Sequence, residues 1–219
     1  MALVHNCIIR AMNSIYIQAP LIPSSEYKSF ISYSLSVFQG LGAHHGGEEE
    51  IFFPELEKWT GEKGIMDTNI AQHEAFHTSL LAWGKWLENV AKTPANFDGH
   101  ECTTLMDQFI APLSTHLADE IPSLVSLSRY CAVLDDKLKG MMKAEGDKVM
   151  AAMSKTTQLP AFLLNHDITF EGGIHVFPPI PALVSWTLRQ CFGRWNASWW
   201  KFSAVGFDGQ PRELLFVKN

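Results

Sequence analysis

The sequence predicts an all-α protein: an up-down four-helix bundle with one additional helix and an irregular C-terminal extension. Three observations support this fold class. Four long stretches carry apolar residues at helical spacing, short loops join them, and no convincing strand pattern occurs before about residue 160. The last 60 or so residues differ in character, being rich in Pro, Gly, Phe and Trp.

The first two helices are expected at residues 3–18 and from about Glu26 to Pro54 or just beyond. In the first, apolar side chains recur every three or four residues, which is the spacing of one helical face. Pro20 and Pro23 end this helix, and the two serines that follow them can cap the next one. These stretches therefore supply the first antiparallel pair of the bundle.

The third and fourth helices are expected at residues 67–90 and 100–130, on either side of a loop at 94–99. The third helix has a continuous apolar side. In the fourth helix, Pro112 and Pro122 each remove a backbone donor, so we expect a kink at both positions.

A fifth, more polar helix is expected at residues 135–154, and the remaining chain has no long helical pattern except at 181–192. We expect residues 1–155 to form the bundle and residues 156–219 to form an extension that packs on it. Its aromatic content is too high for a disordered tail, so it acts either as a structural clasp or as a lid over a pocket.

Composition and charge exclude several classes of function. The chain has 219 residues, 47% of them hydrophobic and 18% charged, and a net charge of −6 without a basic run, which argues against a nucleic-acid partner. The four cysteines are scattered and form no CxxC pair, so thiolate zinc sites and thioredoxin-type chemistry are not supported. No signal-peptide pattern occurs, and prolines interrupt the longest uncharged stretch, residues 172–188. We therefore expect a cytoplasmic protein with no membrane span.

Metal-capable side chains occur in pairs four residues apart on three of the predicted helices. Residues at this spacing lie one turn apart on the same helical face, so each pair can present two ligands to one point. With a further histidine near the N-terminus, the candidate metal ligands are His5, His44, Glu48, His73, His77, His116 and Glu120. Imidazole with carboxylate is a common donor set for iron, whereas structural zinc prefers four ligands and usually some thiolate.

Two simpler interpretations are weaker than a shared metal site. Any one pair could be a surface pair, but three such pairs inside apolar stretches would leave several buried polar groups unpaired. The segment from His73 to His77 also matches HExxH, the zinc-protease motif in which Glu74 would be the general base. A protease would leave the other pairs and His5 without a role, so we expect Glu74 to point away from the metals.

Four segments together resemble the hemerythrin-like, or HHE cation-binding, family, over roughly residues 3–130. They are Val4–Arg10, His44–Pro54, Gln72–His77 and His116–Ile121, and the C-terminal extension is similar to that of fungal members. The resemblance implies an antiparallel four-helix bundle with a non-heme di-iron centre. It also implies that the seven candidate ligands hold the irons, with Glu48 and Glu120 as bridges beside an oxide or hydroxide.

One choice among these ligands rests on alignment to the family pattern. His45 and Glu49 have the same spacing as His44 and Glu48, and we choose the latter because the acidic run and the apolar triplet before Pro54 align better that way. Two glycines between the paired residues weaken the helix by about 1 kcal/mol each relative to Ala. They indicate either a local distortion or a need for space beside the site.

Three functions remain open from the sequence. A histidine-rich di-iron centre favours binding of dioxygen, for storage, delivery or sensing, by analogy with the family's oxygen carriers. The alternatives are a di-iron oxygenase or oxidase acting on a small organic substrate, and a non-catalytic iron-binding module. Zinc or manganese could occupy the same donors. The sequence carries no signal for a particular substrate, redox partner or oligomeric state.

Overall fold

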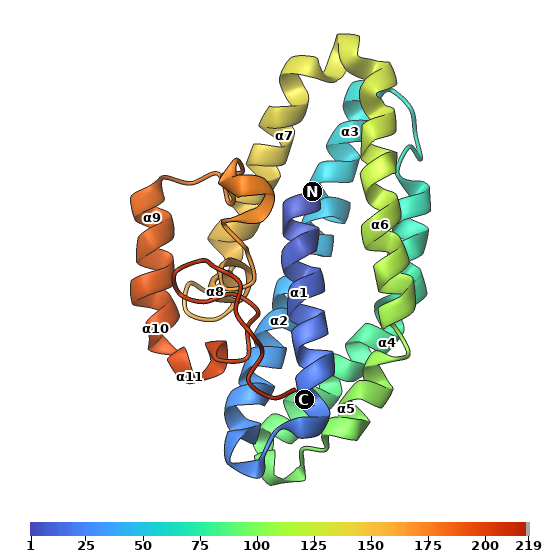
Figure 1. Cartoon of the computed structure of the whole chain (residues 1–219). Helices are drawn as coiled ribbons and strands as arrows, with labels where there is room; N and C mark the ends of the chain where they lie inside the picture. The colour runs from blue at the N-terminus through green and yellow to red at the C-terminus, as the bar shows by residue number, and fades with distance from the viewer. Residues whose placement is uncertain (218–219) are drawn as a thin grey trace.

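The computed structural model describes residues 1–217, apart from the side chains of two residues at 135 and 136, and this part of the chain is all-α (Figure 1). Helix α2 contacts α1 and α4, and helix α6 contacts α4 and α1, so that the four close into a ring. Successive helices of the ring run in opposite directions, which confirms the predicted up-down bundle. The bundle helices are α1 (Ala2–Gln18), α2 (Tyr27–Gly47), α4 (Asp67–Lys92) and α6 (Ile110–Ser126).

The second bundle helix continues past its last α-helical residue. A π-helical turn, η3 (Glu48–Phe52), joins it to α3 (Phe53–Thr60), and Gly61 ends α3 with a φ of 71°. The predicted long helix through Pro54 is therefore present, and the distortion falls directly after the two glycines. A π turn changes the direction in which successive side chains point, and such turns are frequent at functional sites.

The predicted fourth helix is two helices, so the prediction of one helix kinked at two prolines was wrong. Helix α5 (Gly99–Met106) begins with a side-chain cap from Asp98, and the chain then breaks before α6 starts at Ile110. Pro112 lies in the first turn of α6. Backbone N–H groups in a first turn have no partner within the helix, so the N–H that proline lacks costs little stability there. Pro122 does lie inside α6, as expected.

A fifth long helix and several short ones follow the bundle. Helix α7 (Cys131–Ala152) returns along α2 and α3, and α8 (Gln158–Leu163) packs on α2 and α1. The rest of the extension contains α9 (Ala182–Thr187), the π-helical turn η7 (Leu188–Phe192), α10 (Gly193–Trp195) and α11 (Ala197–Trp200). The short 3-10 turns are η1 (Ala19–Leu21), η2 (Ser24–Glu26), η4 (Pro94–Asn96), η5 (Leu127–Tyr130) and η6 (Phe170–Gly173).

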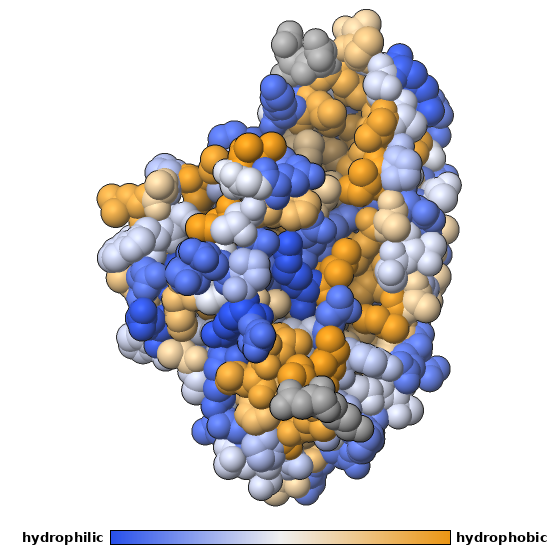
Figure 2. All heavy atoms as spheres, viewed as in Figure 1, coloured by the Kyte–Doolittle hydropathy of each residue, from blue (hydrophilic) through white to orange (hydrophobic). Residues whose placement is uncertain are grey.

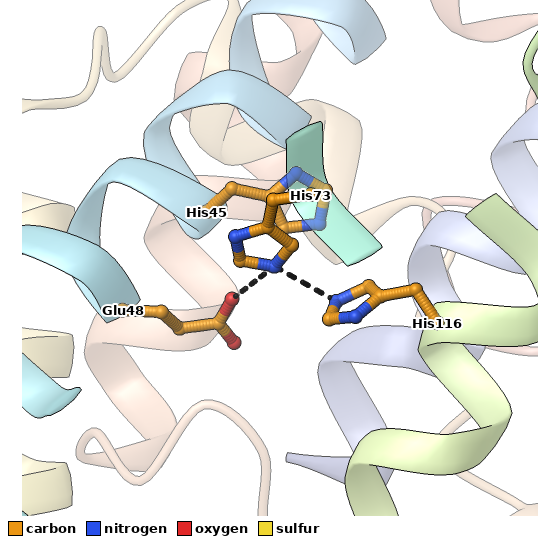
Figure 3. Close-up of side chains that lie close together, drawn as sticks. All are labelled: His45, Glu48, His73 and His116. Carbon is orange, nitrogen blue, oxygen red and sulfur yellow. Dashed lines mark hydrogen bonds and ion pairs between the residues drawn. The ribbon is translucent and has the colours of Figure 1, made fainter. Parts of the chain in front are cut away.

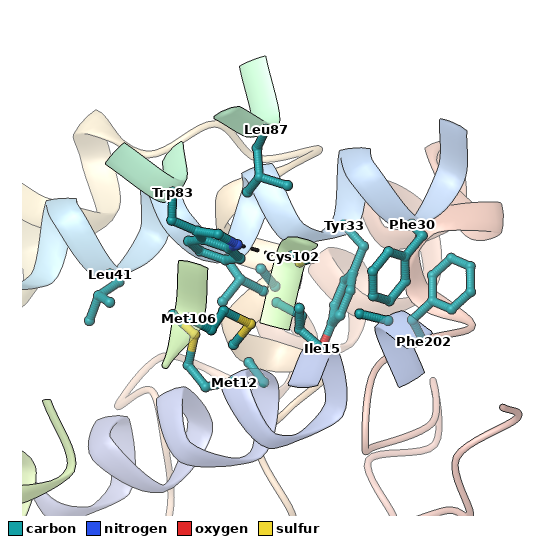
Figure 4. Close-up of a cluster of buried hydrophobic side chains, with 14 of the residues drawn as sticks. Met12, Ile15, Phe30, Tyr33, Leu41, Trp83, Leu87, Cys102, Met106 and Phe202 are labelled. Carbon is teal, nitrogen blue, oxygen red and sulfur yellow. Dashed lines mark hydrogen bonds between the residues drawn. The ribbon is translucent and has the colours of Figure 1, made fainter. Parts of the chain in front are cut away.

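The main apolar core fills one end of the bundle, and Figure 4 shows part of it in close-up. Trp83 lies at its centre and donates a hydrogen bond from Nε1 to Cys102 Sγ at 3.5 Å. A second apolar cluster around Phe52 and Leu56 covers the other end, where η3 and α3 meet α7. Along α2 and η3, His44 and His45 lie between residues of these two clusters, so the polar segment of the bundle is bounded by apolar packing on both sides.

The extension is attached to the bundle by buried contacts rather than by surface contacts alone. Phe202 has no exposed surface and lies in the main core, and its carbonyl accepts a hydrogen bond from Gln18 Nε2 at 2.9 Å. Asn165 Nδ2 donates to the buried hydroxyl of Tyr33 at 3.2 Å. Burying these groups away from water orders the extension against α1 and α2.

None of the helices in residues 1–217 combines the length and the apolar character that a membrane crossing requires.

Candidate metal centre

A cluster of histidine and glutamate side chains lies inside the bundle, contributed by all four bundle helices and by η3. His5 comes from the first turns of α1, His44 and His45 from the end of α2, and Glu48 from the start of η3. His73 on α4, with His116 and Glu120 on α6, completes the cluster. These seven residues are buried, and Glu48, His116 and Glu120 have no exposed surface at all.

One half of the cluster is formed by His45, Glu48, His73 and His116 (Figure 3). One ligand atom from each residue lies within 4.8 Å of those of the other three. His73 Nε2 is 3.0 Å from His116 Nε2 and 3.5 Å from Glu48 Oε2. Three imidazoles and a carboxylate at these distances match the donor number and donor types of a first-row metal site.

The other half is formed by His5, His44 and Glu48, whose ligand atoms also lie within 4.8 Å of one another. His44 Nε2 is 3.2 Å from Glu48 Oε1, and His5 Nε2 is 3.0 Å from Glu120 Oε2. Glu48 therefore belongs to both halves, with one carboxylate oxygen toward each. A carboxylate in this position is shared by the two groups of donors.

Many of the donor atoms have no hydrogen-bond partner within the described part of the chain. Both carboxylate oxygens of Glu48 and of Glu120 are buried without one, and so is Nε2 of His5, His44 and His45. Some of these atoms lie within ion-pair distance of each other, but without the angle of a hydrogen bond. Because leaving this many polar groups unsatisfied costs several kcal/mol, the donor set fits bound cations.

Three residues outside the cluster orient its histidines. The Nδ1–H of His5 donates to the Leu117 carbonyl at 2.9 Å, and His73 Nδ1 pairs with Glu49 Oε1 at 2.5 Å. His116 Nδ1 lies 3.4 Å from Gln72 Oε1. In each case the proton is held on Nδ1, so the Nε2 lone pair points inward and is free to bind a metal.

Burial also sets the protonation states that metal binding needs. It lowers the pKa of His44 and of His45 well below the usual value, and the neighbouring histidines lower it further. Burial, followed by repulsion from His73 and His5, lowers the pKa of His116 to about 3. These imidazoles are therefore neutral ligands near pH 7. Burial raises the pKa of Glu48 well above its usual value, and Glu120 adds to this effect, which a cation would reverse.

The structure brings together six of the seven expected ligands and places the seventh elsewhere. His77 is exposed, outside both groups of donors, and so is Glu74. The HExxH motif therefore does not converge on one point, because only His73 of its three polar residues is buried.

His45 occupies the position in the donor cluster that the sequence assigns to His77. The sequence offers two overlapping pairs, His44 with Glu48 and His45 with Glu49. In the structure both histidines and Glu48 point into the donor cluster, whereas Glu49 holds His73 from outside it. The signal for this arrangement is the run His44–Glu49 itself, in which two adjacent histidines precede a turn that is no longer α-helical.

Helix α7 covers the centre closely because Gly47 has no side chain. A Cβ at this position would lie 2.5 Å from Val149 Cγ2 and 2.7 Å from Glu145 Oε1, whereas a Cβ at Gly46 would meet nothing within 4 Å. The two glycines thus have different roles: Gly47 provides the space beside the site and Gly46 does not. The approach also brings the carboxyl group of Glu145 near the centre, and its charge contributes to the raised pKa of Glu48.

Comparisons with known proteins agree with this geometry. The family model described as "Hemerythrin HHE cation binding domain" matches residues 1–125. A protein of Cryptosporiopsis sp. (strain 8999), named "Dimeric xanthone biosynthesis cluster protein R11", is 33% identical over 215 residues, which cover 98% of this chain and 80% of that relative. No solved structure gives a significant match. The matched residues include every buried donor described above.

Proposed function

We propose that this chain, which belongs to the hemerythrin HHE cation-binding family, holds two iron ions in the bundle and uses them to bind dioxygen. The observation that carries the proposal is the pair of buried donor groups that share Glu48. The metal ligands would be His45, His73 and His116 on one side and His5 and His44 on the other, with Glu48 and Glu120 as bridging carboxylates beside an oxide or hydroxide. In this set His45 replaces His77.

Iron is the preferred metal because the donor set contains nitrogen and oxygen but no sulfur, and because it can supply electrons to dioxygen, which zinc cannot. When bound, two reduced irons would be able to supply two electrons to one dioxygen molecule. Zinc would bind the same donors without giving this chemistry, and manganese could also occupy them. Within the division proposed from the sequence, residues 1–155 would form the di-iron bundle and residues 156–219 its packed extension.

The protein's own residues would hold the centre dry and fixed in orientation. Leu117, Glu49 and Gln72 each hold a histidine proton on the side facing away from the irons, so the ligands are oriented before the metals bind. The apolar clusters above and below exclude water from the polar segment. Five imidazoles and two carboxylates leave the irons less anionic than a carboxylate-rich site would, which favours reversible binding over activation of oxygen.

A second candidate function is an oxidation of a small organic substrate by the same centre. The name of the relative from Cryptosporiopsis sp. associates that protein with a dimeric xanthone biosynthesis cluster. In this case a polycyclic phenol would be the class of substrate to try first. The two functions use the same ligands and differ in whether oxygen leaves unchanged.

The deciding experiment is iron loading of the metal-free protein without air, followed by exposure to air and then to argon. We expect about two irons per chain and an absorption band that appears in air and fades under argon. A band that fades only when a phenol is added and consumed would favour the oxidase. Binding of fewer than two metals, or no response to air, would contradict the proposed centre.

A further inference from the structure

The extension exposes apolar side chains on a scale that the rest of the described surface does not. Ile174, Val176, Leu183 and Trp195 are each more than 70% exposed, at 73%, 75%, 74% and 80%. Figure 2 shows apolar residues gathered at the outer corner of the extension, where α9 begins. The residues of this surface, called here the exposed apolar face, are Ile174, Val176, Leu183, Val184, Trp186, Phe192 and Trp195.

Its position in the fold shows that this face is not required for packing. The same segment has a buried side, where Leu188 packs against residues of α7 and α8 and Arg189 is also buried, so the segment is already held to the rest of the protein. Exposed apolar residues that occur singly need no explanation, but seven within 22 residues concentrate apolar surface on one segment, as interaction surfaces do.

The charge around the exposed apolar face narrows the kind of partner. Residues 172–207 contain no Asp or Glu, and of their three Lys and Arg residues Arg189 is buried, Lys201 pairs with Glu26 and Arg194 is exposed. The protein as a whole carries a net charge of −6, so this acid-free segment stands out against the rest of the chain. A partner surface that is apolar beneath and anionic above would complement it.

We infer that the exposed apolar face binds the surface of a phospholipid bilayer that contains anionic lipids. Leu183, Val184 and the residues at 174 and 176 would enter the boundary between headgroups and acyl chains, while Trp186 and Trp195 would lie at the headgroup level that indole rings prefer. Arg194 is exposed on the same segment and would face lipid phosphates. Three prolines, at 178, 179 and 181, keep the segment on the surface rather than across the membrane.

A second copy of the chain fits this face less well. A two-fold interface would place Arg194 of one copy near its own counterpart, and the carboxylate at the edge of this segment, Glu171, is already paired with His175 at 2.7 Å. The bilayer supplies the missing negative charge together with an apolar layer.

The test is sedimentation of the metal-loaded protein with phosphatidylcholine vesicles and with vesicles that contain about 30% phosphatidylserine. We expect binding to the anionic vesicles, several-fold weaker binding to the neutral ones, and weaker binding as salt increases. Leu183→Glu should reduce binding to the anionic vesicles by about tenfold, since it places a carboxylate where an apolar side chain would enter the bilayer.

Val125→Glu is the matched control, because Val125 is a 66% exposed apolar residue on α6, outside the face. It should bind vesicles as the parent protein does. Circular dichroism and metal content should be unchanged in both variants. Failure of the parent protein to bind anionic vesicles, or equal loss in the two variants, would overturn the inference. So would a stable dimer that Leu183→Glu converts to monomer, since a second copy would then occupy the face.

Discussion

The centre of the bundle and the outer side of the extension both depart from the usual distribution of side chains. The first buries polar groups, and the second exposes apolar ones. The bundle centre hides five imidazoles and two carboxylates that water would otherwise solvate. The extension shows leucine, valine and tryptophan to water at positions where polar residues would cost nothing. Each arrangement is unfavourable in the isolated chain.

The difference between the two regions lies in what could offset that cost. Around Glu48 the unpaired atoms carry lone pairs and lie within 4.8 Å of one another in each donor group, so the matching partner is a small cation. On the extension the unmatched groups are broad, apolar and spread along 22 residues, so the matching partner is an extended apolar surface. Local violations of the folding rules thus indicate the size and chemistry of the partner as well as its position.

The largest expected effect is on metal affinity, and it should be confined to the bundle centre. Glu48→Gln should reduce cation affinity by about 100-fold, because it removes the one carboxylate that faces both halves of the centre. It should not reduce the free energy of unfolding of the metal-free protein, since the neutral amide is easier to bury than an unpaired carboxylate. Vesicle binding by the extension should remain.

These effects can be measured by titration against a chelator, by urea unfolding without metal and by vesicle sedimentation. If metal affinity in Glu48→Gln stays within a factor of about three of the parent protein, Glu48 is not a shared ligand. Loss of vesicle binding in the same variant would mean that the two regions are coupled and that the comparison between them fails.

The next effect concerns which histidines define the bundle centre. His45→Gln should weaken metal binding by about 10- to 100-fold, because it removes one of four donors in its half of the centre. His77→Gln is its matched control, since His77 is one helical turn from His73 but exposed. Isothermal titration with a first-row divalent metal would measure both. The opposite ranking would restore His77 to the ligand set and remove His45.

Sequence patterns predicted the bundle well, because periodicity and pair spacing act within a single helix. The α1 and α4 helices end within two residues of their expected positions, and six of the seven expected ligands lie together inside the ring. The exposed position of His77 is a consequence of rotation around the helix. Residues four apart lie about 40° apart around an α-helix, so His73 can face inward while His77 turns out to solvent. Only the packing of α4 against its neighbours decides which of the two is buried.

Two further features depend on contacts that no local pattern contains. The π-helical turn at Glu48 allows His44, His45 and Glu48 all to point inward, which a regular i,i+4 scheme does not provide. The extension was expected to pack on the bundle, but neither the position of α8 nor the exposure of the segment from Ile174 to Trp195 follows from its composition. The surface of α2, α7 and α8 against which the segment packs decides which of its side chains are buried.

A third effect tests how closely α7 is fitted over the bundle centre. Gly47→Ala should lower the free energy of unfolding by about 1–3 kcal/mol, because the new methyl group would displace Val149 and Glu145. Gly46→Ala should raise it by about 0.5–1 kcal/mol, since the added Cβ meets open space and alanine favours the helix. Urea unfolding of the metal-free variants measures both. Equal stabilisation by the two substitutions would show that α7 does not approach Gly47 closely.

The smallest effect compares the two regions through pH. In the folded protein, burial and repulsion from His73 and His5 lower the pKa of His116 to about 3. Burial and the charges of Arg189 and Arg10 lower the pKa of His166, which is buried in the extension, to about 4. Each group therefore takes up a proton more readily when the chain unfolds. Its stabilising contribution is fully present above the unfolded pKa of about 6.5 and is lost as pH falls toward the folded value.

The metal-free protein should lose about 1–2 kcal/mol of unfolding free energy per such histidine between about pH 7 and pH 5. His116→Gln should remove the share that belongs to the bundle centre, and His166→Gln the share that belongs to the extension. Urea unfolding of the parent and the two variants at both pH values measures these shares. A pH dependence that neither substitution reduces would mean that these two histidines are not held neutral by burial. A reduction in His116→Gln alone would place the pH sensitivity in the metal centre and leave the extension insensitive to acid.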